Sequence, residues 1–294
     1  MSRKGKSTAE DTWDAFPKQP VKRVIRTKPA AKPTAKPAVK PTAKARPKKK
    51  PKQQSPYKFW LGIAALATLA LVVLYVELFV EKPAPVWPAG HSIYGVDVSH
   101  YQKEIDWQQV RENEVSFAFV KATEGRSLKD KHFQKNWDGA GAAGIIRGAY
   151  HFYLPYLKPE VQAENFISTV KLSPGDLPPV LDVEVRGRKP VAQLRKELKV
   201  WLEKVEEAYG VKPIIYTGYN FYQEYLAGHF DQYHLWIAHY NVSKLKLEKS
   251  EKLKLAFWQH TDGGAVKGIE GKVDCNVFYG SMRELRSVCI PLNQ

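Results

Sequence analysis

Short apolar runs alternate with amphipathic stretches from Ile93 to Gln294. Eight of the runs are rich in β-branched and aromatic residues and are typical of strands: IYGVDVS, SFAFVKAT, IIRGAYHFY, PPVLDVEV, KPIIYTG, HLWIAHY, LAFWQHT and a last one near VDCNVF. Helical patterns lie at 107–113, 132–143, 159–170 and 191–209, and after Tyr219 they become shorter or vanish. This order predicts an α/β fold, a TIM-like (β/α) barrel with a strand-rich C-terminal part and with functional groups at the carboxyl ends of its strands.

A much longer apolar run, FWLGIAALATLALVVLYVELFV, covers residues 59–80 and carries one charge, Glu77. At about 1.5 Å per helical residue the run is long enough to cross a hydrocarbon core of about 30 Å. The basic flank before it predicts a single-pass transmembrane signal anchor in the cytoplasmic (inner) membrane, with the N-terminus in the cytoplasm and the later residues periplasmic or otherwise extracytoplasmic. A cleaved signal peptide and a buried core helix are the alternatives, and proline in EKPAPVWP directly after the run disfavours cleavage.

The net charge of +16 is concentrated before this run, since residues 1–58 hold 18 Lys and Arg against 3 Asp and Glu. From Thr27 the tail is a Lys-Pro repeat without large apolar side chains, which predicts a disordered, solvated spacer; a specific partner-binding arm is the alternative. Nucleic-acid binding is not expected, because basic groups for that purpose lie on a folded surface. The predicted organisation is a cytoplasmic basic tail (1–58), the transmembrane anchor (59–80), a linker (81–92) and a barrel domain (93–294).

The two cysteines, Cys275 and Cys289, both lie in the barrel domain. In an oxidising compartment they could form a disulfide that closes a short loop, which would stabilise the fold by about 3 kcal/mol. Two separate thiols are the alternative. Neither metal-ligand spacing nor a cysteine–histidine nucleophile pattern occurs, so we predict no metal and no cofactor.

Two acids share one face of the run PPVLDVEV. Side chains alternate along a strand, so Asp182 and Glu184 point together into the barrel mouth while Leu181, Val183 and Val185 face the helices. Two neighbouring carboxylates repel each other, so at least one pKa should be raised toward neutral pH. A carboxylic acid that still holds its proton there can protonate a leaving oxygen, as the general acid of a glycosidase does.

Further acids and aromatic residues occur near the ends of other predicted strands. Asp97 in YGVDVSH and Asp274 in VDCNVF are the acids. The remaining candidates suit a sugar-binding cleft, because flat rings pack on pyranose faces and polar groups bind hydroxyls. They are His151, Tyr153, Tyr216, Trp236, Tyr240, Trp258 and Gln259. For Trp107, Trp137 and Trp201 we expect packing roles instead.

The stretch from about Ile93 to Phe278 resembles glycoside hydrolase family 25, the Chalaropsis-type lysozymes. The ordered motifs are YGVDVSHYQ with IDW, FAFVKATEG, GAYHFY, PVLDVE, IIYTG, LWIAHY, FWQHT and VDCNVF. The resemblance implies a glycoside hydrolase barrel that acts as an N-acetylmuramidase (lysozyme), hydrolysing the β-1,4 bond between N-acetylmuramic acid and N-acetylglucosamine in peptidoglycan during wall remodelling or degradation. It also implies a role for each matched residue: Glu184 as proton donor, Asp182 as its assistant, Asp97 and Asp274 as the cleft floor, and Tyr150, Tyr153 and Tyr216 as substrate contacts.

Two departures from the family pattern bear on substrate preference. Cys275 stands where the family often has an apolar residue, and Gln259 and His260 follow Trp258 where an aromatic residue is common.

Two other functions remain open from the sequence. A non-catalytic peptidoglycan-binding envelope tether would have little use for two crowded carboxylates, which destabilise a fold. A chitinase of the other barrel type would carry more acids in its strand motif than GDLPPVLDVE does. The role of Asp182 also stays open between direct charge stabilisation, activation of water and orientation of the substrate's own acetamido oxygen.

Overall fold

The computed structural model describes residues 56–79, 86–247 and 255–291. Most of the predicted tail (1–55), residues 80–85 and the chain end (292–294) lie outside the described residues. The chain divides into two units, Met1–Ala64 and Ala65–Gln294, and every strand described below belongs to the second. The predicted division into tail, linker and barrel domain therefore stays a prediction.

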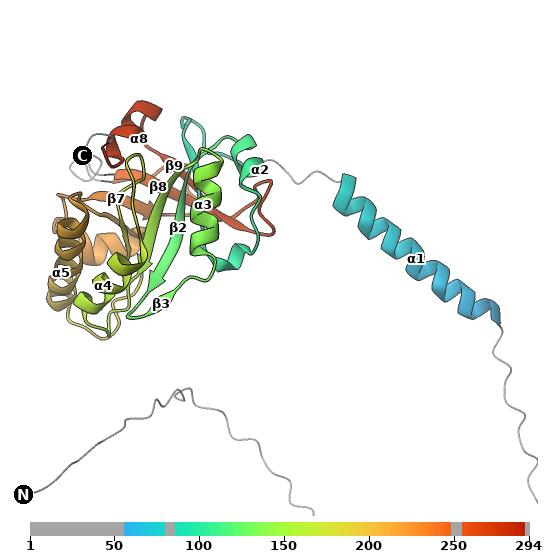
Figure 1. Cartoon of the computed structure of the whole chain (residues 1–294), viewed down its shortest axis with the longest axis horizontal. Helices are drawn as coiled ribbons and strands as arrows, with labels where there is room; N and C mark the ends of the chain where they lie inside the picture. Colours follow the sequence, from blue (N-terminus) through green and yellow to red (C-terminus); the bar gives the residue numbers. More distant parts are fainter. Residues whose placement is uncertain (1–55, 80–85, 248–254, 292–294) are drawn as a thin grey trace, which may run out of the picture. The chain divides into compact units, whose positions relative to one another are not determined.

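The second unit is built on a closed β-barrel (Figure 1). The strands follow the order β1-β9-β8-β7-β6-β5-β4-β2-β3, and a further pairing of β1 with β2 closes the barrel, leaving β3 outside as a short hairpin partner of β2. Their bounds are β1 Tyr94–Val98, β2 Val115–Glu124, β3 Leu128–Lys129, β4 Ile146–Phe152, β5 Val180–Asp182, β6 Ile214–Gly218, β7 His234–Ala238, β8 Leu255–Gly264 and β9 Val273–Phe278.

The predicted TIM-like (β/α) barrel is wrong, because the barrel of eight strands is mixed. Strands β1, β2, β4, β5, β6, β7 and β8 run parallel to one another, whereas β9 runs antiparallel to both β8 and β1. Residues 265–272 between β8 and β9 form no helix, and a parallel return needs a crossover of about a dozen residues or more. The chain therefore turns back as a hairpin at this point.

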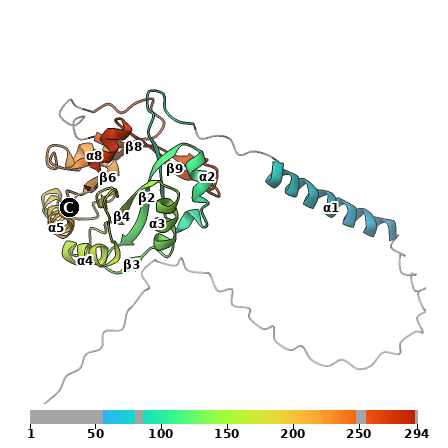
Figure 2. The ribbon, with the colours of Figure 1, turned by 45° about the horizontal axis from the view of Figure 1, so that its top comes forward.

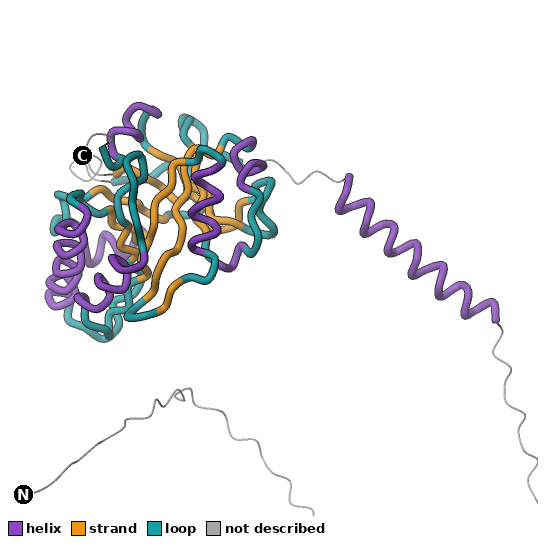
Figure 3. Tube along the Cα trace, in the orientation of Figure 1, coloured by secondary structure: helices purple, strands orange, loops and turns teal. Residues whose placement is uncertain are grey.

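Helices surround the strands unevenly (Figures 2 and 3). Four helices fill crossovers in the first part of the barrel: the short α2 Trp107–Glu112 and the longer α3 Phe133–Ala142, α4 Pro159–Thr169 and α5 Val191–Tyr209. The later part has short elements: α6 Tyr219–Phe221, the π-helical turn η2 Tyr222–Leu226 and, after β9, α8 Met282–Val288. A 3₁₀ turn, η1 His100–Gln102, follows β1 directly.

Side-chain caps fix where several of these elements begin. Asp106 accepts hydrogen bonds from the backbone of Gln108 and Gln109, each 3.1 Å long, and so starts α2. Ser99 caps η1 and Ser281 caps α8, each through a reciprocal capping box. The cap at Ser99 matters most for the site, because Ser99, Tyr101 and Gln102 of this turn line the cavity described below.

Apolar side chains pack in two layers, as strand alternation requires. One layer fills the barrel interior and includes Phe119 and Trp236, whose rings stack with centroids 4.2 Å apart. The other lies between the strands and the helices and includes Leu181 with Trp201 of α5. Aromatic rings such as those of Phe117, Phe119 and Trp236 thus fill much of the interior.

The helix α1 spans Pro56–Phe79 and contains 24 residues. Of the helices in the described residues, none combines the length and the apolar character that crossing a membrane requires. The predicted transmembrane signal anchor at 59–80 is therefore wrong. The described part of this run is helical, but it does not meet the requirements for a membrane span. The last residue of the run, Val80, lies outside the described residues.

Candidate active site

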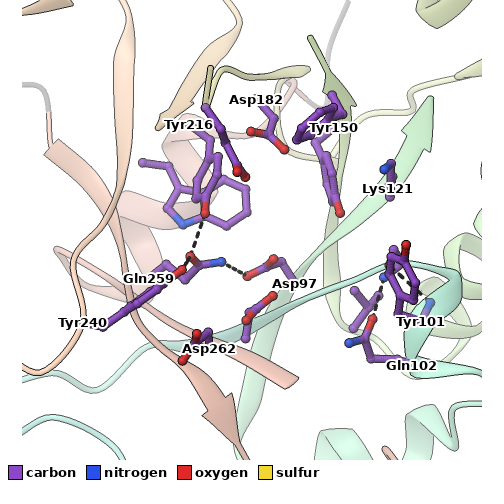
Figure 4. A pocket seen from close by; sticks show the side chains of 16 residues that line it. Asp97, Tyr101, Gln102, Lys121, Tyr150, Asp182, Tyr216, Tyr240, Gln259 and Asp262 are labelled. Atoms are coloured by element: carbon purple, nitrogen blue, oxygen red, sulfur yellow. Dashed lines mark hydrogen bonds between the residues drawn. The ribbon is translucent and has the colours of Figure 1, made fainter. Parts of the chain in front are cut away.

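A cavity of about 320 Å³ opens at the carboxyl ends of the parallel strands (Figure 4). All eight barrel strands, or the residues directly after them, contribute to its wall. The lining residues are Asp97, Val98, Ser99, Tyr101, Gln102, Lys121, Tyr150, Phe152, Asp182, Glu184, Tyr216, Trp236, Tyr240, Gln259, Asp262 and Asp274. The four predicted acids are therefore brought together in one cavity.

Asp182 and Glu184 form a hydrogen-bonded pair at the end of β5. Asp182 is buried, with 5% of its surface exposed, whereas Glu184 is exposed to the cavity. Burial, followed by the charge of Glu184, raises the pKa of Asp182 well above its ordinary value. Burial also raises the pKa of Glu184, against the opposing effects of the Asp182 hydrogen bond and of Lys121. The pair therefore retains a proton at pH values where an isolated carboxyl group would have lost it.

One backbone and one side-chain hydrogen bond hold the main chain extended beyond the last residue of β5. The amide of Val183 donates to the carbonyl of Tyr216 over 2.9 Å, and the hydroxyl of Thr217 donates to the carbonyl of Val183 over 2.6 Å. The extended conformation carries the period-two alternation on to Glu184. Both carboxyl groups consequently face the same cavity.

A second carboxyl pair, Asp97 and Asp274, lies across the cavity. The two are hydrogen-bonded to each other, and Asp97 also accepts 2.8 Å hydrogen bonds from the side-chain amides of Gln259 and Asn276. Burial raises the pKa of Asp97 to about 6, although its amide donors oppose the rise. Burial and the neighbouring charge of Asp97 raise the pKa of Asp274 to about 8. Near pH 7 this pair shares one proton, and Asp97 carries the negative charge.

Aromatic side chains hold in place the two side-chain amides that donate hydrogen bonds to Asp97. The carbonyl oxygen of Gln259 accepts hydrogen bonds from Tyr216 and Tyr240, at 2.7 and 2.6 Å. The carbonyl oxygen of Asn276 accepts a 2.8 Å hydrogen bond from the indole of Trp236. With their oxygens occupied, both amides turn their NH₂ groups toward Asp97. The network thus stabilises a buried carboxylate in one position.

Comparison with known proteins agrees with this geometry. Residues 96–269 match the sequence profile of glycosyl hydrolases family 25. The chain belongs to this family. It is 43% identical to the uncharacterised protein YegX of Escherichia coli K12 over 75% of this chain and 84% of that protein, and 34% identical to lysozyme M1 of Streptomyces globisporus over 68% and 72%. The structure of a family 25 glycosyl hydrolase from Bacillus anthracis is similar with a TM-score of 0.65 and 36% identity, covering 71% of this chain and 99% of that one.

Three predicted substrate contacts lie on the outer face of the family 25 barrel, away from the cavity. His151 is fully buried, bonded to the hydroxyl of Thr123 over 2.7 Å, and stacks on Trp201. Tyr153 is also fully buried and belongs to the layer between strands and helices, as Trp258 does. Strand alternation explains this placement: the neighbours Tyr150, Phe152 and Gln259 face the cavity, so the residues next to them point to the other face. Tyr216, Trp236 and Tyr240 do line the cavity.

Several cavity residues were missed by sequence reasoning. Lys121 follows Phe117 and Phe119 on the inward face of β2, and its ammonium lies 2.7 Å from Glu124. Asn276 follows Asp274 at the same period of two on β9. Alternation from these neighbours would have found both. Tyr101, Gln102 and Asp262 carry no such signal, because turns and a strand irregularity place them.

The possible disulfide between Cys275 and Cys289 is not formed, since both cysteines are free and buried. Cys275 packs in the layer between strands and helices, and Cys289 belongs to the interior cluster with Leu285 of α8. Burial raises the pKa of Cys275 to about 12 and of Cys289 to about 11, so both stay protonated thiols. Within the described ranges, no three His, Cys, Asp or Glu side chains gather in a way that could hold a metal ion.

Proposed function

We propose that this protein is a peptidoglycan-cleaving N-acetylmuramidase, which hydrolyses the β-1,4 bond between N-acetylmuramic acid and N-acetylglucosamine. The observation that carries the proposal is the hydrogen-bonded pair of Asp182 and Glu184, with raised pKa values, at the edge of an acid-lined cavity. Membership of family 25 supports it, as does the similarity to the lysozyme of Streptomyces globisporus.

Glu184 is the proposed proton donor. In the free protein burial raises the pKa of both carboxyl groups, and it raises that of the more deeply buried Asp182 well above its ordinary value, so Asp182 favours its protonated form. Glu184 is the exposed member of the pair and can reach a glycosidic oxygen. A bound glycan displaces water from Glu184, which raises its pKa further and favours transfer of the proton to it. Glu184 then protonates the leaving oxygen as the bond to the sugar carbon breaks.

The spacing of the pair bears on how the sugar carbon is attacked. A retaining nucleophile stands about 5–5.5 Å from the acid and an inverting base about 6.5–9.5 Å from it, on the opposite face of the sugar. Asp182 is in hydrogen-bond contact with Glu184 and therefore acts from the same side. We assign Asp182 to orienting the substrate's acetamido group, whose oxygen bonds to the sugar carbon. In the second step water attacks the sugar carbon, the bond to the acetamido oxygen breaks, and the water gives a proton to Glu184.

The ionised Asp97 has a separate role in this scheme. Positive charge develops on the sugar as the bond to the leaving oxygen breaks, and a fixed carboxylate in a cavity shielded from water stabilises it strongly. Asp97 is 8% exposed and is held by the amides of Gln259 and Asn276. It does not need to reorganise as the charge forms.

The proposed substrate also sets the proposed site of action. Peptidoglycan lies outside the cytoplasmic membrane, so we place the barrel in the periplasm or another extracytoplasmic space. External protease applied to intact spheroplasts should remove a barrel epitope. Full protection of that epitope, with digestion after lysis, would contradict this placement.

The catalytic assignment is tested with Glu184→Gln on purified cell walls. Loss of general-acid catalysis should lower the release of reducing ends by about 10²–10⁴-fold while the melting temperature is maintained. Glu160→Gln, an exposed change on α4, is the matched control and should retain full activity. Full activity of Glu184→Gln would remove it as the acid. Wall binding by the wild-type protein without reducing ends would indicate a tether, and reducing ends from chitin would indicate a chitinase.

A further inference from the structure

Basic side chains gather on the loops that follow β2, β4 and β5. Residues 125–132, 153–158 and 183–190 together hold seven Lys and Arg against two acids, Asp130 and Glu184. Asp130 is buried and accepts hydrogen bonds from the backbone amides of His100 and His132, at 3.0 and 2.8 Å. Glu184 is the proposed proton donor. The remaining surface of these loops is therefore basic.

Most of these basic groups are not neutralised by a neighbour. Arg186 bonds to the carbonyl of Lys189, and Lys189 forms an ion pair with Glu197. The other five are exposed and form no ion pair within the described residues; we call them the basic rim, Arg126, Lys129, Lys131, Lys158 and Arg188. Charges of one sign beside a cleft attract a ligand of the opposite sign. The basic rim therefore suits an anionic ligand.

The three loops lie side by side at the mouth of the acidic cavity. In the barrel, Phe152 pairs with Glu124 on one side and with Asp182 on the other. The amide of Gly125 donates to the carbonyl of Phe152 over 3.1 Å, and the amide of Tyr153 donates to the carbonyl of Asp182 over 2.9 Å. Phe152 and Asp182 also line the cavity. The loops of the basic rim are thus continuous with the proposed active site.

The next part of the barrel lacks this charge. At the ends of β6 and β7 a second cavity of about 360 Å³ shares Glu184 with the first. No Lys or Arg is among the described residues that line it, and the sequence from 213 to 243 contains none. An anionic group on a ligand in the acidic cavity is therefore drawn toward the loops after β2, β4 and β5.

Exposed apolar side chains lie on the same three loops. Leu128, Tyr156 and Val185 are 49%, 74% and 47% exposed, and each follows a different strand. Among the described residues after α1, the other large apolar side chains exposed in this way are Val86 and Tyr101. A ligand that contacts both the basic and the apolar groups is anionic and partly apolar. An acidic peptide has this character, whereas a bare sugar or a phosphate polymer does not.

We infer that the basic rim binds the acidic peptide that N-acetylmuramic acid carries in peptidoglycan. The muramic sugar develops the positive charge, so it lies beside Asp97 in the acidic cavity. Its peptide then passes over the loops after β2, β4 and β5. Peptide carboxylates meet the unpaired ammonium and guanidinium groups there, and apolar peptide side chains pack on Leu128, Tyr156 and Val185. This inference rests on the proposed muramidase function and adds a preference for glycan that carries peptide.

Kinetics on paired substrates test the inference in the full chain. The substrates are peptidoglycan oligomers with their acidic peptides and the same oligomers after removal of the peptides. The triple variant Lys129→Gln, Lys158→Gln and Arg188→Gln should raise KM for the peptide-bearing oligomers about tenfold with kcat little changed. Its KM for peptide-free oligomers should equal that of the wild type. Added salt should raise the wild-type KM for the peptide-bearing oligomers alone, because it screens exposed charges.

A second triple variant is the matched control. Lys171→Gln, Lys212→Gln and Arg283→Gln remove the same charge at exposed positions that the topology puts near the amino ends of the parallel strands. This control should keep the wild-type KM for both substrates. Equal KM values of the rim triple variant and the wild type for peptide-bearing oligomers would overturn the inference.

A binding measurement separates this inference from the proposed function. An N-acetylmuramoyl peptide titrated calorimetrically into the Glu184→Gln protein should bind more tightly than the same compound with its carboxylates amidated. The rim triple substitution, added to Glu184→Gln, should abolish the difference. If the wild type releases no reducing ends, the proposed function fails, yet a rim-dependent preference still establishes the peptide site. Equal binding of the two compounds, or tighter rim-dependent binding of poly(glycerol phosphate), would overturn the peptide site while leaving the hydrolase intact.

Discussion

Asp97 on β1 and Asp274 on β9 stand directly opposite each other in an antiparallel pairing, and their carboxyl groups are hydrogen-bonded. Asp97 lies near the end of its strand, whereas Asp274 is the second residue of its own. In a parallel strand, Asp274 would lie at the amino end and so at the closed end of the barrel. The reversed direction of β9 is therefore what brings the fourth acid into the active site.

This pair predicts a pH-dependent effect of Asp274→Asn on stability. The pKa of Asp274 is about 8 in the fold and near 4 in the unfolded chain, so the native state keeps a proton that the unfolded chain releases. Its contribution to stability is present below pH 4 and is lost as the pH rises to about 8. Asparagine cannot ionise, so the variant should gain stability over the wild type across this window.

Calorimetric melting at pH 4, 6 and 8 measures this effect. We expect a gain in melting temperature of several degrees at pH 8 and little at pH 4, since about 1 kcal/mol corresponds to about 2–4 °C in a domain of this size. Asp231→Asn, at an exposed position, is the control and should change the melting temperature equally little at each pH. A gain that does not depend on pH would contradict the raised pKa.

Lys121 should set the pH range of activity. Its charge lowers the pKa values of both Asp182 and Glu184, against the rise that burial causes. In Lys121→Met both pKa values should rise, so the whole pH profile of kcat/KM should move to higher pH by about 1 unit. Lys121→Arg preserves the charge and should keep the wild-type profile. An unmoved profile in Lys121→Met would show that the lysine charge does not act on the pair.

Two tyrosines three residues apart should behave oppositely. Tyr150 lines the cavity, whereas Tyr153 is fully buried in the layer between strands and helices. Tyr150→Phe should lower kcat/KM about tenfold at an unchanged melting temperature, by loss of a polar contact to substrate. Tyr153→Ala should destabilise the fold by about 3–5 kcal/mol, with normal kinetics for the fraction that remains folded. Denaturant unfolding and initial rates on cell walls measure the two effects. A destabilised Tyr150→Phe together with a stable but catalytically impaired Tyr153→Ala would contradict the assigned faces.

Both cysteines should be reactive thiols once the protein is unfolded. Cys275 and Cys289 are free and buried, and their raised pKa values suppress the thiolate that reacts. A thiol reagent should therefore detect almost none in the native protein and two per chain in denaturant without reductant. Detection of no thiols in denaturant would indicate that the disulfide forms after all.

Strand alternation accounts for where most of the predicted site residues lie. Applied to PPVLDVEV, it placed Asp182 and Glu184 in one cavity. Applied to GAYHFY, it would have separated Tyr150 from His151 and Tyr153, but the predicted set mixed both faces. Residues placed by turns, such as Tyr101 of η1, follow no such period. Neither does the basic rim, whose members come from three different loops.

The sequence by itself determined the succession of strands and helices, the acidic pair within the fourth run and the family to which the chain belongs. These features are local: they depend on side-chain period and on motifs whose residues are neighbours in the chain. The tertiary structure alone decided that β9 runs antiparallel to its neighbours, that Asp97 and Asp274 share a proton, and that a second cavity at the ends of β6 and β7 shares Glu184 with the acidic one. Direction, proximity and burial arise from pairings between distant segments, and they set the pKa values on which the chemistry depends.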